Sequence, residues 1–158
     1  SVQRLVAQLR PGVLDDLGLV AALEWQCQDF ERRSGIRCCC EASEGDIHLD
    51  GPRATAAFRI CQEALTNVAR HAKATSIRVL VEQVNGDLLL EIQDNGLGIP
   101  VEKLTDSASL GLLGMRERAA SLGGQIEIAG RPGKGTTVML RLPCSEQADK
   151  LTRKQADR

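Results

Sequence analysis

The sequence predicts an α/β fold in two layers, a two-layer α/β sandwich with a mixed sheet and its helices on one face. Helical and strand periods alternate along the 158 residues in the order α–β–α–β–β–loop–α–β–β. The composition agrees, because 42% hydrophobic and 26% charged residues are ordinary values for a globular protein. We expect one domain over residues 13–144, the end of another helix over 1–12 and a polar tail over 145–158.

The first helix is predicted to begin with Asp15 or Asp16 as its N-cap and to end before Gly35. A strand over residues 36–42 follows it. The apolar residues at helical spacing, expected on the buried face, are Leu19, Leu23, Cys27 and Phe30.

The clearest helix spans about residues 52–72, and Pro52 suits its first turn. Spacings of three and four place its apolar residues on one stripe, which consists of Phe58, Cys61, Leu65, Val68 and Ala72. A second face, roughly 150° away at the helical period, carries polar groups that both donate and accept hydrogen bonds. Its members are Glu63, Asn67, Arg70 and His71.

The second half of the chain predicts four strands and one helix. Alternating patterns over residues 77–82 and 88–92 flank Asn85-Gly86, a strong signal for a two-residue hairpin. A polar, glycine-punctuated stretch then leads to a helix over about 112–122. The last two strands are expected over residues 125–129 and 136–142.

Charge and composition exclude several classes of function. Lys and Arg total 20 against 21 for Asp and Glu, and this balance gives no basis for binding nucleic acid directly. Trp25, Phe30 and Phe58 are too few aromatic side chains for a base-stacking platform. Six cysteines include no C-x-x-C pair, so we expect no zinc site and interpret them as small apolar residues in a reducing compartment.

The first candidate site is Glu63-x-x-x-Asn67-x-x-x-His71, whose spacing puts all three residues on one helical face. A carboxylate, an amide oxygen and an imidazole together can hold a hydrated Mg²⁺ and a polyphosphate. A polar helix face that only meets water is an equally simple interpretation of this motif taken alone.

Three glycine-containing motifs follow. Residues 94–100 (Asp-Asn-Gly-Leu-Gly-Ile-Pro) place a carboxylate at a strand end, where it can accept a hydrogen bond from an amino group such as adenine N6; an Asx turn is the alternative. Residues 111–118 (Gly-Leu-Leu-Gly-Met-Arg-Glu-Arg) are expected to open a helix with N–H groups suited to phosphate. Residues 133–137 (Gly-Lys-Gly-Thr-Thr) alone suggest a hairpin. Neither the dinucleotide fingerprint nor the P-loop is present.

In this order the motifs closely resemble the N, G1 and G2 boxes and the closing glycine motif of the catalytic ATP-binding domain of sensor histidine kinases, in the GHKL ATPase superfamily. The likeness covers about residues 9–143. The G2 variant, with Leu9-Arg10-Pro11 and Leu14-Asp15-Asp16, resembles the subfamily that pairs with NarL-type regulators. The resemblance implies the GHKL (Bergerat) α/β sandwich.

The resemblance also implies a Mg²⁺·ATP site. Asn67 would coordinate the Mg²⁺, Glu63 and His71 would join it as the catalytic set, and Asp94 would recognise the adenine amino group. A mobile lid would span about residues 101–110. The remaining ATP-binding positions would be Arg70, Gly96, Gly98, Ile99, Gly111, Leu112, Gly114, Met115, Thr136 and Thr137.

The family moves the γ-phosphoryl of ATP to its own histidine and then to an aspartate of a response regulator, here expected to carry a receiver and a helix-turn-helix. That histidine lies on a dimerisation hairpin, of which residues 1–12 resemble only the end. His48 falls in a polar loop, and His71 belongs to the ATP site. We therefore expect this chain to be the cytosolic catalytic part of a longer protein. The complete protein is expected to be a homodimer, and whether it is attached to a membrane is open.

Two alternatives remain beside this hypothesis. An anti-sigma-factor-like serine kinase would use the same ATP fold, although the residues resembling the hairpin end argue against it. A non-enzymatic nucleotide-binding interaction module is the other, and the presence of Asn67, Asp94 and the glycine motifs argues against that.

Overall fold

A computed structural model of the chain describes residues 12–45, 47–98, 106–145 and 154. The predicted helix end over residues 1–12, except Gly12, and nearly all of the predicted tail lie outside these ranges. None of the described helices has the length and apolar character needed to cross a membrane.

The strands form one five-stranded sheet in the order β1-β2-β3-β5-β4. Their bounds are β1 Arg37–Ala42, β2 Ser76–Val84, β3 Asp87–Asp94, β4 Gln125–Arg131 and β5 Gly135–Pro143. Strand β1 pairs with β2 in parallel and every other pair is antiparallel, so the sheet is mixed, as predicted.

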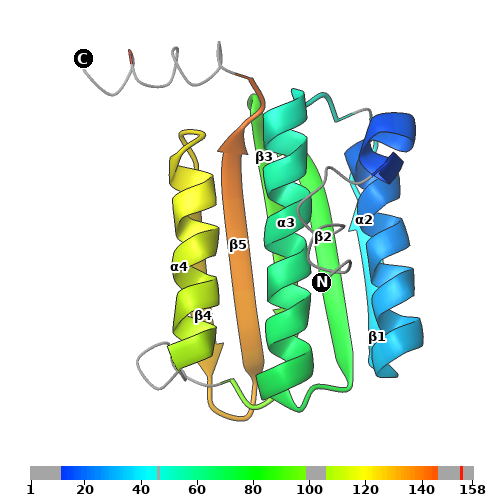
Figure 1. Cartoon of the computed structure of the whole chain (residues 1–158), viewed down its shortest axis with the longest axis vertical. Helices are drawn as coiled ribbons and strands as arrows, with labels where there is room; N and C mark the ends of the chain where they lie inside the picture. The colour runs from blue at the N-terminus through cyan, green and yellow to red at the C-terminus, as the bar shows by residue number, and fades with distance from the viewer. Residues whose placement is uncertain (1–11, 46, 99–105, 146–153, 155–158) are drawn as a thin grey trace, which may run out of the picture.

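Three helices cover one face of this sheet, which confirms the predicted two-layer α/β fold (Figure 1). They are α2 (Gly12–Ser34), α3 (Gly51–Asn67) and α4 (Asp106–Ala120). A π-helical turn, η1 (Val68–Ala72), continues α3. The β2–β3 connection is the predicted hairpin, and positive φ angles of 52° at Asn85 and 81° at Gly86 match a type I′ turn.

Helix α2 is interrupted at Gly18, whose φ of 83° and ψ of 179° are not helical. The predicted start at Asp15 or Asp16 is therefore wrong, because the uninterrupted part of the helix begins only after this glycine. That backbone conformation is essentially restricted to glycine. The predicted inner face is correct: Leu19, Leu23, Cys27 and Phe30 are all buried.

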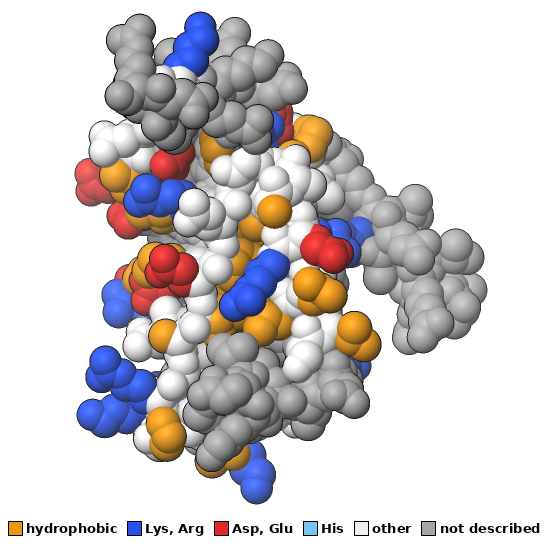
Figure 2. Space-filling model, turned by 90° about the vertical axis from the view of Figure 1, so that its left-hand side faces the viewer, with side chains coloured by type: hydrophobic (Ala, Val, Ile, Leu, Met, Phe, Trp, Pro, Cys, Tyr) orange, Lys and Arg blue, Asp and Glu red, His pale blue; other side chains and the backbone are white. Residues whose placement is uncertain are grey.

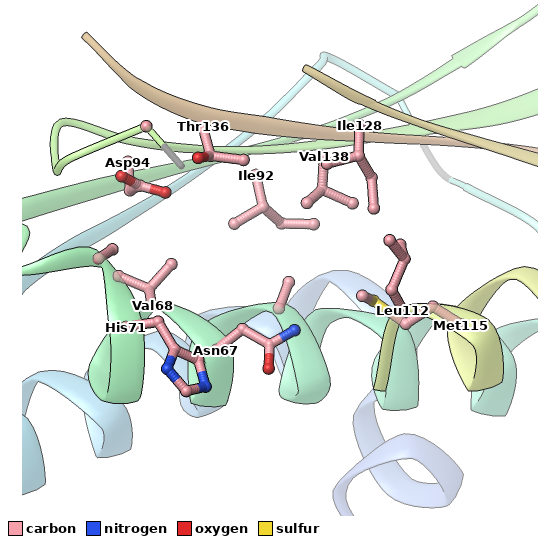
Figure 3. Close-up of a pocket in the computed structure, with 13 residues that line it drawn as sticks. Asn67, Val68, His71, Ile92, Asp94, Leu112, Met115, Ile128, Thr136 and Val138 are labelled. Carbon is pink, nitrogen blue, oxygen red and sulfur yellow. The ribbon is translucent and has the colours of Figure 1, made fainter. Parts of the chain in front are cut away.

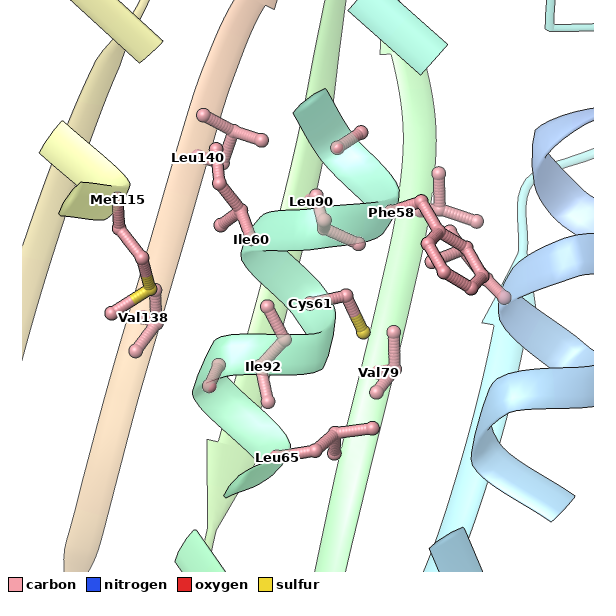
Figure 4. Close-up of a cluster of buried hydrophobic side chains, with 14 of the residues drawn as sticks. Phe58, Ile60, Cys61, Leu65, Val79, Leu90, Ile92, Met115, Val138 and Leu140 are labelled. Atoms are coloured by element: carbon pink, nitrogen blue, oxygen red, sulfur yellow. The ribbon is translucent and has the colours of Figure 1, made fainter. Parts of the chain in front are cut away.

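Helix α3 lies across the middle of the sheet and contributes the centre of the core (Figure 4). Ile60 and Cys61 are completely buried, and Phe58 and Leu65 are nearly so. These side chains point toward strand residues that alternate inward, including Ile92. The predicted apolar stripe of this helix is thus its packing surface.

The start of α3 is held by a partly buried ion pair that the sequence patterns did not indicate. Asp50 caps the helix, because its Oδ1 accepts a hydrogen bond from the Arg53 backbone N–H at 2.9 Å. Arg53, only 4% exposed, donates from Nη1 to Asp50 Oδ2 at 2.7 Å and from Nη2 to the Leu122 carbonyl at 3.3 Å. The pair therefore ties α3 to the turn that follows α4.

Helix α4 begins at Asp106, well before the predicted start at residue 112. Each glycine inside a helix costs about 1 kcal/mol relative to alanine, and α4 contains Gly111 and Gly114. Leu112, Met115 and Ala119 are nevertheless all buried on one face of α4, and their packing outweighs that cost. The expectation that these glycines open a helix is therefore wrong for this conformation.

Strand β1 forms one edge of the sheet, and β4 forms the other edge, beside α4. Figure 2 views the molecule from this side, where hydrophobic side chains are interspersed with charged ones. Ile126 and Ile128 of β4 are half-buried, whereas Glu127 between them is exposed. Charged residues on an edge strand discourage pairing with another chain.

We expect Asp50→Ala to destabilise the domain by more than the ~1 kcal/mol of an ordinary N-cap, because the buried Arg53 guanidinium then lacks its counter-charge. Asp50→Asn, which keeps a cap acceptor, should cost less. Urea denaturation followed by circular dichroism measures both. No loss for Asp50→Asn, with only the ~1 kcal/mol of an ordinary cap lost in Asp50→Ala, would show that the ion pair contributes nothing beyond the cap.

Candidate functional site

A cavity of about 80 Å³ lies between α3 and η1 on one side and the sheet on the other. Figure 3 shows Asn67 and His71 on the helical side, with Asp94 and Thr136 on the sheet side. Helix α4 closes one end of the cavity with Leu112 and Met115. The lining residues are Ala64, Asn67, Val68, His71, Ala72, Ile92, Asp94, Gly98, Leu112, Met115, Ile128, Thr136 and Val138.

Among the described residues, Asp94 is the one acidic side chain that lines this cavity, and it is 5% exposed. Its Oδ1 accepts a hydrogen bond from the Gly96 backbone N–H at 2.7 Å, and the Thr136 backbone N–H also donates to the carboxylate. Burial raises the pKa of Asp94 above its ordinary value, and the two backbone hydrogen bonds oppose that rise. The carboxylate is thus held in a fixed orientation within an apolar cavity.

The loop after Asp94 is clamped on both sides. Leu97 donates its backbone N–H to the Ala72 carbonyl at 2.7 Å and accepts at its own carbonyl from the Gly133 N–H at 2.8 Å. Asn95 Oδ1 accepts from the backbone N–H groups of Thr75 and Ser76, at 2.9 and 3.0 Å. The end of η1 and the β4–β5 turn therefore fix the loop that carries the carboxylate.

Glycine is required at two points of this clamp. Gly98 has a φ of 66°, and a Cβ atom there would collide with the Arg131 carbonyl. A Cβ at Gly96 would collide with the Ala72 carbonyl. The two glycines singled out in the sequence thus allow neighbouring backbones to approach closely, and Gly98 also lines the cavity.

A second cavity, of about 500 Å³, lies in the groove between α3 and α4. Glu63, Gly111 and Gly114 line it, and Met115 lines both cavities. A Cβ at Gly111 would meet the Glu63 carboxylate, so this glycine lets α4 approach the polar face of α3. The flanking positively charged residues are Arg59 and Arg118.

The structure does not bring every predicted residue to these cavities. Thr137 faces away from the first cavity and lines a hollow with Met139, because successive residues of β5 point to opposite faces of the sheet. Arg70 is exposed on η1 and lines neither of the two cavities. Ile99, together with residues 101–105 of the predicted lid, lies outside the described residues.

Sequence analysis identified Leu112 and Met115 but missed the rest of the apolar lining of the first cavity. Ile92 lies two residues before Asp94, and Val138 lies two residues after Thr136. Strand alternation alone puts each of them on the same face as its polar neighbour, and this signal could have identified both. Ala64 and Val68 precede Asn67 and His71 by three residues, which is helical spacing.

This arrangement suits a planar, amino-bearing ring. The apolar residues of α3 and the sheet can contact the two faces of such a ring, and its amino group can donate to the Asp94 carboxylate. An amide oxygen and an imidazole on the helical side, with the groove beside them, offer polar partners for a charged extension of the same ligand. Among the described residues, no group of three His, Cys, Asp or Glu side chains is arranged to hold a metal ion.

Residues 53–146 match the sequence profile of the histidine kinase-, DNA gyrase B- and HSP90-like ATPase family. Sensor histidine kinase MctS of Rhizobium johnstonii is 39% identical, over 99% of this chain and 34% of its own length. The signal transduction histidine-protein kinase/phosphatase DegS of Brevibacillus brevis is 34% identical, over 93% of this chain and 38% of its own length. The chain thus spans little more than a third of these curated relatives.

Solved structures show the same fold. The histidine kinase domain of the blue-light activated histidine kinase EL346 from Erythrobacter litoralis has a TM-score of 0.65 at 24% identity, covering 82% of this chain and 63% of that one. Histidine kinase AdeS of Acinetobacter baumannii has a TM-score of 0.65 at 18% identity, covering 92% and 79% respectively.

The family predicted from the four motifs is therefore confirmed, and the matched residues 53–146 contain the helix, the loop and the strands that form the cavity. This chain belongs to the histidine kinase-, DNA gyrase B- and HSP90-like ATPase family.

Proposed function

We propose that this chain is the ATP-binding catalytic domain of a two-component sensor histidine kinase. The observation that carries the proposal is the buried Asp94 carboxylate, fixed by two backbone N–H groups inside an apolar cavity and facing the polar residues of α3 and η1. The two curated relatives, both named as histidine kinases, support the same function.

Asp94 is proposed to read the adenine of ATP through its exocyclic amino group. A carboxylate accepts hydrogen bonds only, so it favours a base that presents an amino donor over one that presents a carbonyl. Ile92, Met115 and Thr136 would border the ring. The cavity encloses only about 80 Å³, less than typical ligand pockets, so we infer that Leu112 and Met115 shift outward when the base enters.

The phosphates are proposed to lie along the groove between α3 and α4, near Asn67, His71 and the glycines of α4. Opening of the first turns of α4 would free the N–H groups around Gly111 and Gly114 for phosphate oxygens. Arg70, exposed on η1, is proposed to add positive charge at the mouth of the site.

Asn67 is the proposed ligand of Mg²⁺, with Glu63 one helical turn earlier orienting water in the same site. An amide oxygen and a nearby carboxylate suit this hard cation, which keeps most of its waters and binds phosphates directly. When bound, Mg²⁺ neutralises charge on the phosphates. The chain's own residues hold the nucleotide and exclude water from the base.

The reaction proposed for the whole protein is attack by a histidine nitrogen on the γ-phosphorus of ATP, with ADP as leaving group. A response-regulator aspartate would then take the phosphoryl group. We propose that the accepting histidine lies outside these 158 residues, on a dimerisation hairpin of a homodimeric protein. His48 is exposed in the loop before α3, and His71 lines the nucleotide cavity. The domain is proposed to be cytosolic and to span residues 13–144.

We expect Asp94→Ala to weaken ATP binding at least tenfold, because a hydrogen bond to a charged group contributes about 1.5–3 kcal/mol. Isothermal titration calorimetry with a non-hydrolysable ATP analogue and Mg²⁺ measures the affinity. Asp87→Asn is the matched control, since Asp87 lies at the other end of the same strand, and it should bind normally. No binding by the unmutated chain at millimolar nucleotide would refute the proposed site.

Asp94→Asn should stabilise the nucleotide-free domain while it weakens ATP binding. Because the folded-state pKa of Asp94 is raised, ionisation of this group costs stability, and the cost grows as the pH rises from the unfolded pKa through the folded one. The gain in thermal midpoint should therefore be present at about pH 7 and shrink toward about pH 4. A gain in thermal midpoint that is the same at both pH values would show that burial of the ionised carboxylate does not destabilise the domain.

With labelled ATP, we expect the chain by itself to remain unlabelled and a separately supplied hairpin bearing the phosphoacceptor histidine to become labelled in trans. Asn67→Ala should abolish the transfer, because Asn67 is the proposed Mg²⁺ ligand. The label that protein retains on a filter is measured after acid treatment and after alkali treatment. This comparison distinguishes phosphohistidine, which is acid-labile, from phosphoserine. Acid-labile label on the chain itself would contradict the assignment of both of its histidines.

A further inference from the structure

Several thiols gather outside the nucleotide cavity, where α2 packs against β1. Cys38 and Cys40 alternate with Cys39 along β1, so the first two face the helical layer while Cys39 is exposed. Cys27 comes from α2, and Cys61 comes from α3, where Figure 4 shows its sulfur beside Val79. The fold thus assembles cysteines whose sequence spacing indicates no site.

Two separate contacts hold Cys27 against β1. Its thiol lies in side-chain contact with the thiols of Cys38 and Cys40. One turn further along α2, Glu31 Oε1 accepts a hydrogen bond from the Cys38 backbone N–H at 3.0 Å. The turn of α2 that carries Cys27 therefore lies directly over the inward face of β1.

Solvent access distinguishes the thiols of this group. Cys40 is half-buried, whereas Cys38 is 7% exposed, Cys27 is 1% exposed and Cys61 is fully buried. Among the inward-facing thiols, a small dissolved oxidant therefore reaches Cys40 before Cys38, Cys27 and Cys61. Cys39 is more exposed but points away from Cys27, whereas Cys40 packs on the core and contacts Cys27, so an oxidised Cys40 already touches a second thiol.

The thiol contacts also affect the pKa values. Contact with Cys27 lowers the pKa of Cys40, which favours its thiolate, while burial and the Glu24 and Glu41 carboxylates oppose that shift. The pKa of Cys27 is raised, first by its contacts with Cys38 and Cys40 and then by burial, so Cys27 remains a neutral thiol. Contact with Cys27 lowers the pKa of Cys38 as well, so the lower exposure of Cys38, and not its pKa, separates it from Cys40. An accessible thiolate beside a second cysteine is the usual arrangement of a redox-sensitive pair.

We propose that Cys40 is an oxidation site for small hydroperoxides and that Cys27 converts the oxidised product into an intrachain Cys27–Cys40 disulfide. In the first step the Cys40 thiolate attacks the peroxide, forming a sulfenic acid and releasing hydroxide. The Cys27 thiol then attacks the sulfenic sulfur, and water leaves. The net change is two thiols and one hydrogen peroxide giving one disulfide and two waters.

A disulfide at this place would join α2 covalently to the edge strand β1. Its S–S length of about 2.05 Å is much shorter than a contact between two thiols, so its formation draws the helix toward the strand. The modification would lie where α2 packs against β1, at one edge of the sheet (Figure 1). Neither Cys27 nor Cys40 lines the proposed nucleotide cavity.

The test treats the reduced 158-residue chain with hydrogen peroxide, blocks the remaining thiols with maleimide and maps the peptides without reduction. We expect an intact mass lower by about 2 Da before blocking, a peptide pair linking Cys27 to Cys40, and reversal by dithiothreitol. A link from Cys27 to Cys38 or to Cys61, or six thiols that all still react with maleimide, would overturn the proposal.

Two variants and one control test the roles assigned to Cys40 and Cys27. Cys40→Ser, at a half-buried position that tolerates a hydroxyl, should abolish the disulfide and leave Cys27 reduced. Cys27→Ala should let Cys40 proceed to the sulfinic acid, a gain of about 32 Da. Cys144→Ala, a buried cysteine that follows β5, should keep the Cys27–Cys40 link. A disulfide at Cys27 in the Cys40→Ser variant would refute the assignment.

Discussion

The packing of α3 against the middle of the sheet is the contact on which both the core and the candidate site depend. Its inner stripe places Ile60 and Cys61 in full burial against the sheet. Loss of one such large side chain costs about 2–5 kcal/mol, a large share of the stability of a domain. The same packing fixes the rotation of the helix, and with it the direction in which Asn67 and His71 face.

Burial of the Asp94 carboxylate in the site costs stability, and packing of the core offsets this cost. Asp94 is buried with a raised pKa, although a solvated carboxylate would be more stable by itself. Backbone N–H groups from Gly96 and Thr136 reduce this cost and orient the carboxylate toward the cavity. Because the loop is clamped between η1 and the β4–β5 turn, the orientation is set before any ligand arrives, which lowers the entropy cost of binding.

Helix α4 is the element in which local preference and tertiary packing disagree. Its two internal glycines weaken the helix, while Leu112 and Met115 gain burial by closing the end of the cavity. A helix held mainly by its packing opens more readily when a ligand competes for the same contacts. The small cavity and the glycines inside α4 are thus both consequences of how α4 packs against the site.

Patterns in the sequence determined the elements, the inner face of α3, the Asn85-Gly86 hairpin and the family, because periodicity, turn chemistry and motif order are local properties. They also identified Asn67, His71, Asp94 and Thr136, which the fold brings to one cavity. Long-range contacts decided the rest. The partly buried Asp50–Arg53 pair reaches Leu122, and Cys27 meets Cys40 only through the packing of α2 on β1. These features depend on which surfaces meet in three dimensions, and no local spacing encodes that.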